Sequence, residues 1–160
     1  MKKIFAVCLL LLLFCSFTLV GCQEELSYNE SKFVGNWGLQ DIVVYGEIPG
    51  GTLKYPSKNQ TFNGLYKRLV GKTEIVLTNK KKDGYILGKF NIEEEQIDFQ
   101  WKVGDDSRKI ELKNSLEILS LERYNKNELS TGYFHSITVI DDKMAILVNQ
   151  VVMYTFSKTA

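Results

Sequence analysis

The chain has 160 residues, with 20 basic and 19 acidic side chains and a net charge of +1. This balance argues against a nucleic-acid partner, because phosphate binding requires a clear surplus of basic residues. All three cysteines lie within the first 22 residues, so the rest of the chain has no disulfide, no thiol nucleophile and no cysteine ligand for zinc. A body of this length can bury one core without covalent staples, and we expect one domain.

The first 21 residues have the pattern of an export signal. Lys2 and Lys3 precede an uncharged, mostly apolar run from Ile4 to Val20, and Gly21 and Cys22 follow it. A basic start, an apolar middle and a small residue before the cut are typical of a signal peptide. The run of 17 residues is just long enough to cross about 30 Å of hydrocarbon, so an uncleaved membrane anchor is the alternative.

The segment Leu19-Val20-Gly21-Cys22 resembles the lipobox of bacterial lipoproteins. The resemblance implies that the Cys22 sulfur carries a diacylglycerol and that the signal is cut on the amino side of this residue. The expected location is the bacterial cell envelope, with the protein held on a membrane by its lipid. Because Gln23 follows in place of aspartate, the outer membrane is favoured in a Gram-negative host. The predicted division is a signal peptide over residues 1–21, a lipidated cysteine with a flexible tether over 22–32, and a domain over 33–160.

From Phe33 onward the pattern is that of β-strands with short polar links. Ile97, Phe99, Trp101 and Val103 alternate with polar residues, which places four apolar side chains on one face of a strand over 96–103. Asp83-Gly84 is typical of a type I′ hairpin turn, whose two central residues need positive φ. Further strands are predicted over 73–78, 85–92, 108–113, 116–121, 135–140, 144–148 and 151–156. About eight to ten strands and no long helix pattern indicate an all-β sandwich or barrel, with its longest loop over 46–59.

The segment Gly35-Asn36-Trp37 opens the first expected strand and resembles the Gly-x-Trp signature of lipocalins and of bacterial lipocalin-like lipoproteins. The resemblance implies a small antiparallel up-and-down barrel in which Gly35 lets the chain turn into the strand and Trp37 plugs the closed end. Lipocalins place an arginine over this tryptophan. Lys158 stands at roughly that position, and lysine lacks the flat group with which arginine stacks. Trp37 as an ordinary core residue of another β-sandwich is the alternative.

The candidate ligand-binding residues are Ile97, Phe99 and Trp101, because an eight-stranded barrel is just wide enough to hold one small ligand. The same aromatic residues would equally serve as core. The expected function is therefore a membrane-anchored module for a small apolar or amphipathic ligand. The alternative is an interaction lipoprotein with a filled barrel that docks to an envelope protein.

No constellation indicates an enzyme, a metal site or a cofactor. His135 is the only histidine, and the Gly-x-Ser-x-Gly elbow of serine hydrolases is absent. Lys80-Lys81-Lys82 precedes the hairpin turn and is predicted to be a solvated tip, with contact to anionic headgroups as the second interpretation.

Overall fold

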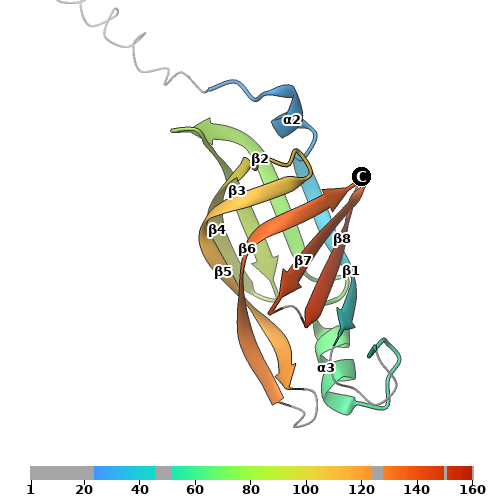
Figure 1. The fold of residues 1–160 in the computed structure, drawn as a ribbon. Coiled ribbons are helices and arrows are strands. Elements are labelled where there is room, and N and C mark those ends of the chain that lie inside the picture. The colour runs from blue at the N-terminus through green and yellow to red at the C-terminus, as the bar shows by residue number, and fades with distance from the viewer. Residues whose placement is uncertain (1–23, 46–51, 124–127, 150, 160) are drawn as a thin grey trace, which may run out of the picture.

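The alternating strands close into a single barrel in the computed structural model, which describes residues 24–45, 52–123, 128–149 and 151–159. Each strand pairs antiparallel with the next, and β1 pairs with β8 to complete the ring (Figure 1). The strands are β1 (Gly35–Val44), β2 (Glu74–Lys82), β3 (Tyr85–Ile92), β4 (Glu95–Val103), β5 (Lys109–Arg123), β6 (Glu128–Ile140), β7 (Lys143–Val148) and β8 (Val152–Lys158). The all-β, lipocalin-like barrel is therefore confirmed, with eight strands in the described residues, and the sandwich alternative is wrong.

The hairpin prediction at Asp83-Gly84 is confirmed. The two residues have φ of 53° and 75°, and they join β2 to β3. The strand predicted over 96–103 is β4, in which Phe99 and Trp101 are buried. The strands predicted over 108–113 and 116–121 form one strand instead. β5 runs through both, and a register shift against β6 between Glu111 and Leu116 absorbs the break in the apolar alternation.

A ten-residue helix that the sequence pattern did not indicate follows the long loop. Helix α3 (Gln60–Leu69) is capped by Asn59, whose side chain accepts a hydrogen bond from the Phe62 amide at 2.8 Å. Its apolar face buries Phe62, Leu65 and Leu69, which belong to the same core as the barrel interior. Packing of this face compensates for Gly64 and for the many polar residues that weaken the helix on its own.

The segment before the barrel is more ordered than the predicted tether. Glu24 forms an isolated antiparallel bridge with Lys81, and the short helix α2 (Tyr28–Ser31) begins with a capping box between Ser27 and Glu30. The Glu30 carboxylate, buried at 7% exposure, lies 2.9 Å from the Lys81 ammonium. The part of the predicted tether that the structure describes, from Glu24 onward, therefore lies against the barrel through Lys81. The predicted signal, the lipobox and Cys22 lie outside the described residues.

The two ends of the barrel differ. Because β1 begins after α2 and the strands alternate in direction, the β2–β3, β4–β5 and β6–β7 turns and the C-terminus lie at the end that carries α2. We call this the α2 end. Helix α3 lies at the opposite end, the α3 end (Figure 1). Between them the interior is packed with aromatic side chains, with Phe90 in edge-to-face contact with Phe134 and Phe156.

Candidate binding site

The barrel wall opens between β4 and β5. These strands pair only near the α2 end, through Trp101↔Leu112, Lys102↔Glu111 and Val103↔Ile110. On its other side β4 stays paired with β3 as far as Glu95. The β5-facing edge of β4 is therefore unpaired below Trp101, and this opening is here called the seam. An unpaired edge leaves backbone N–H and C=O groups free to bind another molecule.

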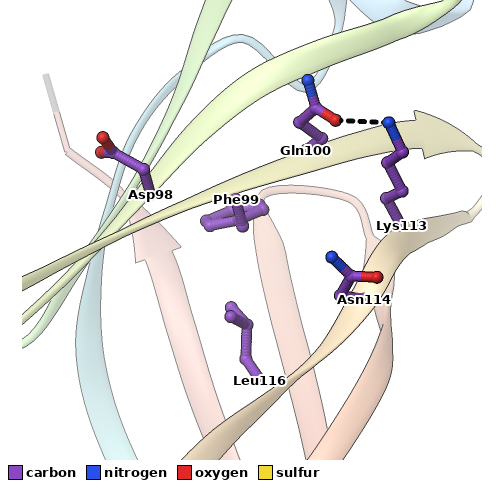
Figure 2. A pocket seen from close by; sticks show the side chains of 6 residues that line it. All are labelled: Asp98, Phe99, Gln100, Lys113, Asn114 and Leu116. Atoms are coloured by element: carbon purple, nitrogen blue, oxygen red, sulfur yellow. Dashed lines mark hydrogen bonds between the residues drawn. The ribbon is translucent and has the colours of Figure 1, made fainter.

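A cavity of about 280 Å³ occupies the seam. Figure 2 shows the Phe99 ring and the Leu116 side chain pointing toward each other across it. Both side chains are more than 90% buried, so they form an apolar floor. The rim is polar, and it is made by Asp98, Gln100, Lys113 and Asn114. An apolar floor with a few polar groups around it is the usual composition of a small-molecule site.

The position of Phe99 depends on a glycine in the neighbouring strand. Gly88 lies directly opposite Phe99, and a Cβ on Gly88 would come within 2.5 Å of the Phe99 Cζ. The ring thus lies over the bare backbone of Gly88. The absence of a side chain at this position lets the aromatic ring lie in the wall while one side of it lines the seam cavity.

Lys113 supplies the positive charge of the rim. Its ammonium donates a hydrogen bond to Gln100 Oε1 at 2.9 Å, and it lies 5.1 Å from the centre of the Tyr85 ring. Both partners are neutral, so the lysine charge is not neutralised by either. The carboxylate of Asp98, on the other side of the rim, accepts a hydrogen bond from Gln96 at 3.2 Å. The rim therefore offers a cation on β5 and an acceptor on β4.

The three predicted ligand-binding residues lie in different places. Phe99 lines the seam cavity. Trp101 has no exposed surface. Its Nε1 donates to the Leu87 carbonyl at 3.3 Å, and its ring packs edge-on against Phe33, so it is a core residue. Ile97 is partly buried against the core. Leu116 and Lys113 were missed, because they lie on another strand and only the fold brings them beside Phe99.

A second cavity lies at the α2 end. It measures about 340 Å³, and its apolar wall consists of Phe33, Trp37 and Val139. Its polar residues are Lys32, Ser107, Arg108, Asp141, Asp142 and Lys158. Trp37, which the resemblance implies as the plug of the closed end, is 1% exposed and donates a hydrogen bond from Nε1 to the Phe33 carbonyl at 3.0 Å. We call this cavity the α2-end pocket.

The structure also places the other residues that the sequence singled out. His135 is exposed on β6. Within the lysine run, Lys81 is bound to Glu30, whereas Lys80 and Lys82 are exposed. Among the described residues, no three His, Cys, Asp or Glu side chains lie close enough together to hold a metal ion.

The fold and the seam define a small eight-stranded antiparallel barrel of lipocalin-like form with a lateral cavity. Comparison with models of protein families, with curated proteins and with solved structures finds no match for this chain. None of the helices in the described segments is long and apolar enough to span a membrane.

Proposed function

We propose that this chain is a lipid-anchored protein of the bacterial cell envelope whose barrel binds a small amphipathic ligand at the seam. The observation that carries the binding proposal is the cavity between Phe99 and Leu116, where the wall opens beside an unpaired strand edge. The anchor is supported by the lipobox-like segment that ends at Cys22 and by the basic and apolar residues before it.

The size and lining of the seam cavity restrict the ligand. Small-molecule sites usually measure about 300 to 1,000 Å³. A cavity of 280 Å³ therefore suits a single short chain or one ring. The apolar part of the ligand would lie over Phe99 and Leu116. Its polar end would lie at the rim, where Lys113 favours an anionic group such as a carboxylate.

The ligand proposal is tested on residues 23–160, which contain every strand and every core residue described above. The purified protein is examined by native mass spectrometry for a bound passenger, and it is then titrated with decanoate and with decanol by calorimetry. We expect decanoate to bind more tightly than decanol, because only decanoate pairs with Lys113.

Two variants locate the site. Lys113→Gln should weaken decanoate binding about tenfold, the loss typical of one hydrogen bond to a charged group, and leave decanol binding unchanged. Lys109→Gln, an exposed lysine of the same strand that does not line the cavity, is the matched control. Absence of any passenger and of binding by both probes would contradict the proposal, as would equal losses in both variants.

The anchor is tested separately, on the full chain expressed in a bacterium. The membrane-bound product should begin at Cys22 and carry the added mass of acyl chains. Cys22→Ser should leave the precursor uncut and without lipid. A wild-type product that keeps residues 1–21, or that is cut elsewhere, would refute the anchor and would leave the ligand site untouched.

A protein partner is the second candidate, and it is favoured by large apolar side chains on the outer face of β6 and β7. Tyr133, Ile140 and Leu147 are each more than half exposed. Exposed apolar groups on neighbouring strands are typical of an interaction surface. A photo-crosslinking amino acid at Leu147 in growing cells should then capture one discrete partner, which the same label at Leu87, an exposed leucine of β3, should not.

A further inference from the structure

The α2-end pocket holds charges of both signs that the folded chain leaves without an opposite partner. The four ion pairs among the described residues join Arg68 to Glu93, Lys81 to Glu30, Lys102 to Glu111 and Arg108 to Asp106. None of them involves Lys32, Lys158, Asp141 or Asp142, which all line the pocket.

The two lysines of the pocket are held by neutral groups. The Lys158 ammonium donates to the Lys32 carbonyl at 3.3 Å and lies 5.4 Å from the centre of the Trp37 ring. The Lys32 ammonium lies 4.2 Å from the centre of the Tyr28 ring. These contacts do not cancel the charge of either ammonium group, and both lysines line the pocket.

The two carboxylates are placed by the β6–β7 turn. Asp141 has φ of 53°, and the Asp142 carbonyl accepts a hydrogen bond from the Lys158 amide at 3.3 Å. The backbone of the turn is therefore tied to the end of β8. The carboxylates and the lysines line one pocket, yet they lie beyond the 4.0 Å that an ion pair requires.

We propose that the α2-end pocket binds a phosphoethanolamine headgroup. Its phosphate would lie at Lys32 and Lys158, and its ammonium would lie at the Asp141-Asp142 turn. A simple anion would be repelled by the two carboxylates, and a simple cation would be repelled by the lysines. A quaternary choline has no N–H to donate to the carboxylates, whereas a primary ammonium has three.

The volume of the pocket agrees with a headgroup. A volume of about 340 Å³ lies at the lower end of the range of small-molecule sites, about 300 to 1,000 Å³. This is enough for a phosphoethanolamine group and too little for the acyl chains of a phospholipid, which would stay outside.

The geometry favours a membrane lipid as the source of this headgroup. This assignment of the source rests on the proposed anchor at Cys22. Glu24 is held at the α2 end by its bridge to Lys81 and by a hydrogen bond from the Gly84 amide to its carboxylate at 3.3 Å. Cys22 precedes Glu24 by two residues, so the chain between them spans at most about 7 Å. A lipidated Cys22 would therefore bring the α2 end, with its pocket, to the level of the headgroups.

The headgroup proposal is tested on residues 23–160 by following amide NMR signals during titration with glycerophosphoethanolamine. We expect the amides of Asp142, Lys158 and Arg108 to shift in a saturable manner. Glycerophosphocholine, and inorganic phosphate mixed with ethanolamine, should bind at least tenfold more weakly. Equal binding of glycerophosphocholine would overturn the proposal, and so would the absence of saturable shifts at these amides.

Asp141→Asn is the informative variant, because asparagine tolerates the positive φ of this position and removes only the charge. It should weaken glycerophosphoethanolamine binding about tenfold. Asp83→Asn is the matched control, since Asp83 has the same φ of 53° in a turn at the same end but does not line the pocket. A similar loss in both variants would contradict a specific site.

Vesicles identify the source of the headgroup. Residues 23–160 should be retained on phosphatidylcholine vesicles only when phosphatidylethanolamine is added, and Asp141→Asn should abolish the retention. Binding of the soluble headgroup without retention on vesicles would overturn the membrane as its source. Residues 23–160 do not include Cys22, so these binding measurements do not depend on the anchor. Loss of headgroup binding is therefore distinguishable from absence of lipid on Cys22, which is measured by the mass of the full chain.

Discussion

Lys158 places its ammonium 5.4 Å from the centre of the Trp37 ring, at the end of the barrel where the chain enters and leaves. The Lys158 ammonium contacts the indole ring through its point charge, without the flat stacking that an arginine would allow. The lysine also donates to the Lys32 carbonyl, so it joins the last strand to the segment before the first.

Lys158→Met should lower the free energy of unfolding by about 0.5–1 kcal/mol, because it removes a cation–π contact at an exposed site. Lys158→Arg should retain the stability of the wild type. Urea unfolding of residues 23–160 measures both. Equal stability of the methionine variant and the wild type would show that the contact contributes nothing.

Gly35 makes room for this contact, which gives a physical reason for a glycine two residues before Trp37. Its φ is 141°, and a Cβ at this position would lie 2.8 Å from the Lys158 Cε. Gly35→Ala should therefore destabilise the barrel by about 1–3 kcal/mol, mainly through backbone strain. Gly64→Ala in α3 is the control, because a Cβ there meets nothing within 4 Å, and it should stabilise by about 0.5–1 kcal/mol. Urea unfolding that ranks the two variants in the reverse order would refute the argument.

Local patterns predicted the parts of the fold that depend on neighbours in sequence. The Asp83-Gly84 turn needs only two residues with positive φ, and the alternation around Phe99 and Trp101 needs only one strand. Helix α3 escaped prediction because its intrinsic preference is weak and its stability comes from packing three apolar residues on the barrel. The order of the segment before β1 escaped it too, because Glu30 meets Lys81 across 51 positions of the chain.

The seam could be predicted only in part. The alternation of β4 placed both Phe99 and Trp101 on the inner face, so it could not tell which of them lines a cavity. The structure distinguishes them, because Trp101 pairs with Leu112 of β5 and Phe99 has no partner residue in β5. Register across strands is a non-local property. The pairing of β5 with β4 ends at Leu112, within the stretch of β5 where its register against β6 shifts. No spacing within a single strand contains this information.

Glu30 should make the attachment of α2 depend on pH. Burial acts to raise the pKa of Glu30, but hydrogen bonds from Lys81 and Ser27 outweigh it and hold the pKa below its ordinary value of 4.5. A depressed folded-state pKa means that the stabilisation is complete above about pH 4.5 and is lost as the pH falls through the folded value. At neutral pH, Glu30→Gln should therefore be less stable than the wild type by about 1–3 kcal/mol, and this difference should shrink in acid.

Urea unfolding of the wild type and of Glu30→Gln, from neutral pH to below about pH 4.5, measures the difference in their free energies of unfolding. Glu93→Gln serves as the control, because its pair with Arg68 is about 40% exposed on both sides and should contribute little. A difference for Glu30→Gln that stays constant down to acid pH would show that the charge of Glu30 is not what holds the segment.

Tyr154 should lower the free energy of unfolding of the barrel at alkaline pH. It lies on β8 with no exposed surface, and burial raises the pKa of its hydroxyl far above the ordinary value of 10.0. Since the folded-state pKa is raised, the stability contributed by the neutral hydroxyl is complete below about pH 10 and is lost progressively as the pH rises above it, where the unfolded chain ionises first. Tyr154→Phe cannot ionise, so its stability relative to the wild type should improve steadily between about pH 9 and about pH 11. The measurement is urea unfolding followed by circular dichroism at each pH. A stability difference between the two proteins that does not change over this range would mean that Tyr154 reaches water, and can ionise, without unfolding of the barrel.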